Sequence, residues 1–157
     1  MKRYLSVLQD SLRQKNELLT ELGQLCDEQE SILRDETLDA DTFDGLVNQK
    51  DVLIDRIVKL DNGFEAVYDK IRDKVEIEKK LYTKEISQIQ ELLTKTIELT
   101  TVLQAKEKRL KNMLDRKIAG MKKEIGQARR GSRAAYDYYK SMSGYGGTIP
   151  SQFTEKS

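Results

Sequence analysis

The chain has 157 residues, of which 28 are Lys or Arg and 27 are Asp or Glu, so its formal net charge is +1. It holds no His and one Cys, which excludes a His-based catalytic triad, a zinc site built from several Cys or His ligands, and an intrachain disulfide. No apolar run approaches the roughly 20 residues of a membrane-spanning helix, and no signal peptide is evident at the start, so we expect a cytoplasmic protein.

A helix is predicted over about residues 2–36. Its apolar residues recur at alternating steps of three and four, the pattern of an amphipathic helix packed against another helix. This stripe consists of Leu5, Leu8, Leu12, Leu19, Leu22, Cys26 and Leu33, with Lys15 and Gln29 as polar interruptions. We interpret Cys26 as a buried structural thiol, because no activating base for a nucleophile is apparent.

A second helix is predicted over about residues 40–76, with residues 39–42 offering side chains that cap its first turn. Residues 61–63 (Asp-Asn-Gly) are a turn signal, but the apolar spacing keeps its phase across them, so the helix is expected to continue through Gly63. Its stripe is Phe43, Leu46, Leu53, Ile57, Leu60, Phe64, Val67 and Ile71, with Lys50 as the polar member.

A third helix is predicted over about residues 79–128. Its stripe is Ile86, Ile89, Leu93, Ile97, Leu103, Leu110, Leu114, Ile118, Met121 and Ile125. The apolar face thins between residues 72 and 83 with no Gly or Pro, so either a turn lies there or one helix runs from about 40 to 127. We prefer three helices, because an antiparallel return buries the last stripe within one chain.

Residues 131–157 are rich in Gly, Ser and Tyr, have no sustained period and hold five of the ten aromatic residues. A flexible tail with aromatic residues is typical of a segment that orders on a partner. The predicted fold is therefore all-α: an elongated antiparallel helical hairpin or three-helix coiled-coil bundle over residues 1–130, with a flexible C-terminal tail over 131–157.

The charge is unevenly distributed. Residues 1–103 carry 15 basic and 22 acidic side chains, whereas residues 104–133 carry 11 basic and 3 acidic ones. The basic run fits a structural face paired with acidic helices, an acidic protein partner, or nucleic acid. We favour the structural face and expect no nucleic-acid ligand, because the whole chain is neutral and no aromatic residue interleaves the run before Tyr136.

The layout resembles a family, the flagellar export chaperones of the FlgN type with their FliT-like relatives. The resemblance is carried by residues 18–22 (LLTEL), 28–33 (EQESIL), 50–54 (KDVLI), 60–65 (LDNGFE) and 134–143 (AAYDYYKSMS). It implies a cytoplasmic helical chaperone that binds C-terminal helical segments of hook–filament junction proteins, prevents their early assembly and delivers them to export gate and ATPase components at the membrane. It also implies that a tail Tyr-Gly element contacts the gate, and Tyr145-Gly146-Gly147 is similar to that element.

A helical cargo segment lays its apolar face into a groove between helices. We expect the later part of the third stripe to outrun the other helices and stay uncovered, although the first half fits ordinary core equally well. The candidate partner-binding residues are Ile97, Leu103, Leu110, Leu114, Ile118, Met121, Tyr136, Tyr139 and Tyr145.

Other functions stay open at this point. A structural coiled-coil adaptor that dimerises and bridges partners fits the same stripes, and a homodimer fits the chaperone hypothesis too. An enzyme is the least expected class, since no catalytic constellation is present in the sequence. We expect no cofactor, no metal ion and no small-molecule substrate.

Overall fold

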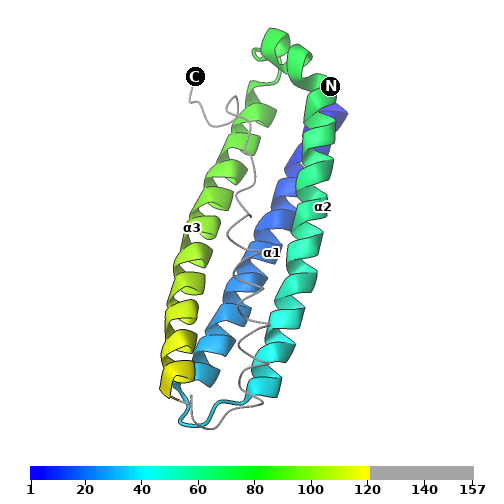
Figure 1. The fold of residues 1–157 in the computed structure, drawn as a ribbon. Coiled ribbons are helices and arrows are strands. Elements are labelled where there is room, and N and C mark those ends of the chain that lie inside the picture. Colours follow the sequence, from blue (N-terminus) through cyan, green and yellow to red (C-terminus); the bar gives the residue numbers. More distant parts are fainter. Residues whose placement is uncertain (121–157) are drawn as a thin grey trace. The chain divides into compact units, whose positions relative to one another are not determined.

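The computed structural model describes residues 1–120, which form three helices joined by two short connections (Figure 1). Helix α1 spans Lys2–Arg34, α2 spans Ala40–Glu78 and α3 spans Thr83–Gly120. The described residues contain no strand, and the predicted all-α fold class is confirmed. The bounds of α1 and α2 differ from the sequence prediction by at most two residues, and α3 begins four residues later than predicted. The predicted end of the third helix and the predicted tail lie outside the described residues.

The described residues divide into two compact units. Unit 1 comprises residues 1–20 and 55–100, and unit 2 comprises residues 21–54 and 101–120. Each unit therefore contains one segment of every helix. Within each unit α2 runs antiparallel to its two neighbours while α1 and α3 run parallel, because each short connection reverses the direction of the chain (Figure 1).

The core of unit 1 is mainly apolar, with Gln9, Lys15 and Thr96 as its buried polar residues. Its buried cluster takes residues from all three helices: Leu5, Leu8, Leu12, Phe64, Tyr68, Ile71, Val75, Ile89 and Leu93. Met1 and Tyr82 are partly buried against this cluster. Each fully buried Leu or Phe side chain contributes roughly 1.5–3 kcal/mol to stability. The free energy gained by burying the cluster therefore exceeds the cost of a single residue with weak helix propensity.

Gly63 illustrates this balance. The turn signal at residues 61–63 is overridden, since α2 continues without interruption from Ala40 to Glu78. A glycine costs about 1 kcal/mol inside a helix, which is less than the gain from burying Phe64 beside it. The prediction that the helix continues through Gly63 is confirmed.

The core of unit 2 mixes apolar and polar side chains. Its buried apolar members are Leu22, Cys26, Leu33, Phe43, Leu46, Val47, Leu53, Leu103, Leu110 and Leu114. Gln29, Lys50 and Glu107 are buried among them.

The spacing of three and four predicted the buried positions of α1 correctly, including its polar interruptions at Lys15 and Gln29.

The two connections are closed by hydrogen bonds. Before α2, the Thr42 amide donates to Asp39 Oδ1 at 3.1 Å and the Thr42 hydroxyl donates to Asp39 Oδ2 at 2.7 Å, as expected for a helix cap. These bonds to the charged carboxylate lower the pKa of Asp39 below its ordinary value. Between α2 and α3, the Leu81 amide donates to the Glu78 carbonyl at 2.9 Å, and this turn shows that α2 and α3 are separate helices.

Candidate functional site

The apolar stripe of α3 in unit 2 lies in the core. Leu103, Leu110 and Leu114 are 2%, 1% and 4% exposed. The expectation that the later part of the stripe outruns its neighbours is therefore wrong for Leu114, and Leu103 and Leu110 fit the alternative of ordinary core. The physical reason is that α1 extends far enough to cover α3, because Lys117 Nζ donates to the Leu33 carbonyl at 3.3 Å and contacts the Asp35 carbonyl as well.

The remaining candidate residues lie in different surroundings. Ile97 is 44% exposed, because the neighbouring Thr96 takes the core position and is 2% exposed. The Thr96 hydroxyl lies 2.6 Å from Asn16 Oδ1 and 2.8 Å from the Leu92 carbonyl, so its polar group is satisfied in the core. Ile118 is half-buried. The other four candidates, Met121, Tyr136, Tyr139 and Tyr145, lie outside the described residues.

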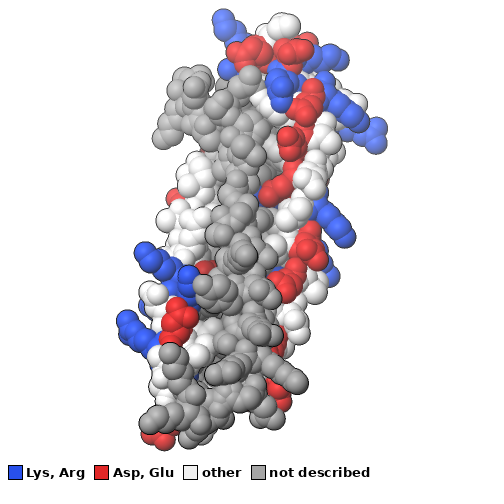
Figure 2. All heavy atoms as spheres, viewed as in Figure 1, with Lys and Arg blue, Asp and Glu red and all other residues white. Residues whose placement is uncertain are grey.

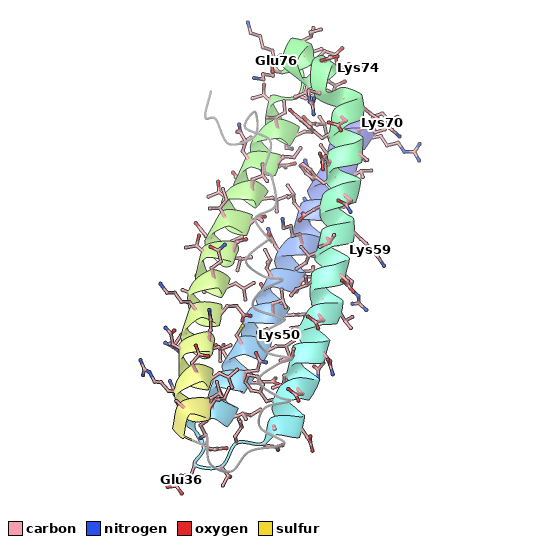
Figure 3. All side chains as sticks on the ribbon, in the orientation of Figure 1. Glu36, Lys50, Lys59, Lys70, Lys74 and Glu76 are labelled. Carbon is pink, nitrogen blue, oxygen red and sulfur yellow. The ribbon has the colours of Figure 1, made fainter. Side chains whose placement is uncertain are left out.

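A buried polar layer crosses unit 2 at the level of Lys50 (Figure 3). The Lys50 ammonium forms an ion pair with Glu107 on α3 and donates to Gln29 Oε1 on α1 at 2.7 Å. Lys50 is 0% exposed and Glu107 is 5% exposed. A buried charge is tolerated only when it is paired and hydrogen-bonded, and this layer supplies both kinds of contact from three helices.

Cys26 belongs to the same layer. Its thiol donates to Glu107 Oε1 at 3.0 Å, and the residue is 1% exposed. Burial raises the pKa of this thiol to about 12, and the charge of Glu107 adds to the rise while that of Lys50 opposes it. At neutral pH the thiol is protonated and buried, as the structural interpretation of Cys26 requires.

The basic run of α3 pairs with acidic residues of α1. Lys106 Nζ lies 2.9 Å from Asp27 Oδ1, and Arg109 forms an ion pair with Glu30. Lys117 contacts the carbonyl groups at the end of α1, where a cation is favourable because the helix dipole is negative. For these three residues the structure supports the interpretation as a structural face, while Lys108 and Arg116 are exposed.

Unit 1 joins α3 to α1 with uncharged groups. Gln9 Nε2 donates to the Glu85 carbonyl at 3.3 Å and to Gln88 Oε1 at 3.1 Å. Asn16 Nδ2 donates to the Leu92 carbonyl at 3.3 Å. These contacts fix the register of two parallel helices. None of the groups that take part in them is an acid or a base.

The sequence analysis missed two core residues of α3, Thr96 and Glu107. The signal was present, because steps of three and four from Leu93 lead to residues 96, 100, 103, 107 and 110. The predicted stripe jumped from Ile97 to Leu103 and from Leu103 to Leu110, and the polar residues between were not considered as core. Glu107 is the partner that the buried Lys50 requires.

Three comparisons bear on the kind of protein this is. No protein-family model, no curated protein sequence and no solved structure matches the chain. Among residues 1–120 no helix is long and apolar enough to cross a membrane, and no three His, Cys, Asp or Glu side chains gather as a metal site.

Proposed function

We propose that the chain is a cytoplasmic flagellar export chaperone similar to the FlgN type. In this proposal it binds the helical C-terminal segments of hook–filament junction proteins and keeps these subunits from assembling before export. It then passes them to export gate and ATPase components at the membrane. It acts by binding and carries out no catalytic step.

The observation that carries the proposal is the set of three long amphipathic helices at the expected positions. Four of the five segments on which the family resemblance rests lie on these helices, residues 18–22 and 28–33 on α1 and residues 50–54 and 60–65 on α2, while the fifth, residues 134–143, lies outside the described residues. Long helices with apolar seams at steps of three and four are a framework to which a further amphipathic helix can add.

The burial of the stripe narrows the proposed contact surface. Leu103, Leu110 and Leu114 are already buried, so they are removed from it. Ile97, which is 44% exposed, and Ile118, which is half-buried, keep their places on α3. Met121 and the tyrosines Tyr136, Tyr139 and Tyr145 stay in the proposal as sequence predictions.

The test is complex formation with the C-terminal segments of junction proteins, measured by size exclusion with light scattering and by calorimetry. We expect a complex of defined stoichiometry. Ile97→Asp should weaken it by about tenfold or more, since a charge placed in an apolar contact is costly to desolvate. Val58→Asp on α2 is the matched control, because Val58 is 42% exposed and lies outside the candidate set.

Two outcomes would contradict the proposal. If the protein forms no complex with any junction segment, the chaperone function is lost. If it forms a stable dimer that ignores these segments, the coiled-coil adaptor becomes the better description. Equal weakening by Ile97→Asp and Val58→Asp would show that Ile97 is not part of the contact surface. The chaperone function would then still be tested by whether the wild type forms the complex.

A further inference from the structure

The last residues of α2 and the connection after it, residues 77–82, are called here the α2–α3 turn and carry the two most exposed large apolar side chains of the described residues. Ile77 is 83% exposed and Leu81 is 75% exposed. The other exposed large hydrophobic residues, Tyr4, Val7, Val52, Val58, Ile97 and Val102, lie between 42% and 54%. Single exposed apolar residues are ordinary, but two neighbouring ones exposed to this degree form a surface feature.

The fold holds both side chains outward. Val75 is buried in the core of unit 1 and Tyr82 packs against the same cluster, whereas Ile77 and Leu81 between them are exposed. The backbone of the turn is fixed by the bond from the Leu81 amide to the Glu78 carbonyl at 2.9 Å and by the bond from the Tyr82 amide to the Lys79 carbonyl at 3.3 Å. Turning Ile77 inward would rotate Val75 out of the core, so the exposure is built into the fold.

Basic residues slightly outnumber acidic ones around this pair. Residues 74–85 carry four lysines against three glutamates, and Glu76 is held by Lys79 at 3.6 Å. Residues 1–9 add Lys2 and Arg3 and no acidic residue. They lie at the same end of unit 1, because Met1 and Tyr82 pack against one cluster. Figure 2 shows Lys and Arg side chains together with Asp and Glu side chains around the turn, and Figure 3 labels Lys74 and Glu76 there and Lys70 further along α2.

We propose that the α2–α3 turn is a membrane-surface contact that inserts Ile77 and Leu81 among the lipids of an anionic bilayer. The lysines around the turn then meet the negative headgroups, and their long aliphatic stems let the charged ends stay in the headgroup region. This contact is peripheral, as is usual for an amphipathic element that lies at the interface.

The shape and size of the feature favour a bilayer over a protein partner. The two side chains project from a tight turn, and a stable protein interface buries about 800 Å² on each partner, far more than two aliphatic side chains offer. A fluid bilayer accepts a few protruding apolar groups and adds the attraction of its surface charge. The proposal stands independently of the export function, because it uses none of the candidate cargo residues.

The experiment is cosedimentation of the full chain with vesicles of phosphatidylcholine, with and without phosphatidylglycerol. We expect binding to the anionic vesicles at low salt. The double variant Ile77→Ser, Leu81→Ser should bind at least about tenfold more weakly, since both apolar anchors are lost. Lys80→Gln with Lys84→Gln should weaken binding severalfold and reduce its salt dependence.

The matched control is Val52→Ser with Val102→Ser, which removes two exposed apolar side chains from unit 2. This control should bind vesicles like the wild type, and circular dichroism should show that all variants keep their helices. Failure of the wild type to bind anionic vesicles would overturn the proposal, as would undiminished binding of the Ile77→Ser, Leu81→Ser variant. Loss of binding to a junction-protein segment in that variant, with no vesicle binding by the wild type, would identify the turn as a protein contact and overturn the lipid assignment.

Discussion

The two halves of α3 are attached to α1 by different chemistry. In unit 1 the contacts are uncharged: Gln9 bonds Gln88 at 3.1 Å, and Thr96 lies 2.6 Å from Asn16 Oδ1. In unit 2 the contacts are ionic, with Lys106 and Arg109 paired to Asp27 and Glu30. Helix α3 is thus held to α1 by uncharged groups in unit 1 and by ion pairs in unit 2. Only the second kind of contact is expected to weaken when salt is added.

The cores of the two units differ in the same way. Unit 1 closes over an apolar cluster and pairs its buried Lys15 with the partly exposed Asp61 at 2.8 Å, whereas unit 2 buries both members of its pair, Lys50 and Glu107. A buried ion pair adds little net stability, because the cost of removing both charges from water offsets their attraction. Its value lies in specificity: only one rotation of α3 brings Glu107 to Lys50. We therefore predict that the position of α3 depends mainly on charged pairs in unit 2 and mainly on apolar packing in unit 1.

The largest expected effect comes from breaking the buried pair. Glu107→Leu leaves the Lys50 ammonium without its buried carboxylate partner and should lower the free energy of unfolding by about 3–5 kcal/mol. The double variant Lys50→Met, Glu107→Leu removes both charges and should be close to the wild type in stability or above it. Urea unfolding followed by circular dichroism measures both. A small loss in the single variant would show that the pair is not buried as the structure has it.

The packing of unit 1 is tested by Ile89→Ala. Ile89 is 0% exposed, so removing its side chain should cost about 2–5 kcal/mol through lost burial and the cavity left behind. Ile97→Ala on the same helix is the control and should cost less than about 1 kcal/mol, because that side chain is 44% exposed. Equal losses from the two variants would mean that the rotation of α3 in unit 1 differs from the structure. The same urea titration serves as the measurement.

The thiol of Cys26 makes unit 2 sensitive to high pH. Its pKa is raised from 9.0 to about 12 by burial, so in the folded chain it keeps its proton where the unfolded chain loses it. The contribution of the thiol to the free energy of unfolding is fully present below about pH 9 and is lost as the pH rises toward 12. The free energy of unfolding falls by about 1.4 kcal/mol by pH 10. Urea midpoints between pH 8 and pH 10 should therefore fall more steeply for the wild type than for Cys26→Ala. Parallel slopes would show that the thiol does not titrate differently on folding.

The smallest effect concerns the outer ion pairs of unit 2. Lys106→Gln with Arg109→Gln should lower the free energy of unfolding by about 1 kcal/mol or less, since both pairs are partly exposed. The same change, and high salt, should speed the labelling of Cys26 by a thiol reagent, because α3 opens more often from α1. Lys95→Gln is the control: Lys95 pairs with Glu98 on the same helix in unit 1, so its loss should leave the labelling rate unchanged. Labelling that ignores both salt and the double variant would contradict ionic attachment.

Much of the fold followed from the spacing of apolar residues. The stripe from Leu5 to Leu33 predicted the buried face of α1, including the buried polar residues Lys15 and Gln29. Asp39 was expected near the cap of α2 and bonds Thr42 there. The turn at residues 79–82 was left open by the sequence, because it holds neither Gly nor Pro and its apolar residues, Leu81 and the neighbouring Ile77, face solvent. Their poor phase was the signal that they do not belong to the core.

The candidate site was predicted less well. Leu103, Leu110 and Leu114 were candidates for cargo binding, and the stripe beyond Leu110 was expected to be uncovered, but all three residues are buried. A sequence gives the apolar face of a helix but not the length of the neighbours that lie against it. Ile97 was placed in the stripe, but the structure turns the neighbouring Thr96 into the core instead.

What the sequence by itself determined is the all-α class, the bounds of α1 and α2 to within two residues and the apolar face of α1, because periodicity and capping act over a few residues and need no knowledge of neighbours. What only the tertiary structure decided is which polar side chains enter the core. Glu107 is an ordinary surface residue by composition, and it becomes a core residue because Lys50 from another helix meets it there. Such a pair joins residues far apart in the chain, and its free energy depends on burial that forms only when the helices pack.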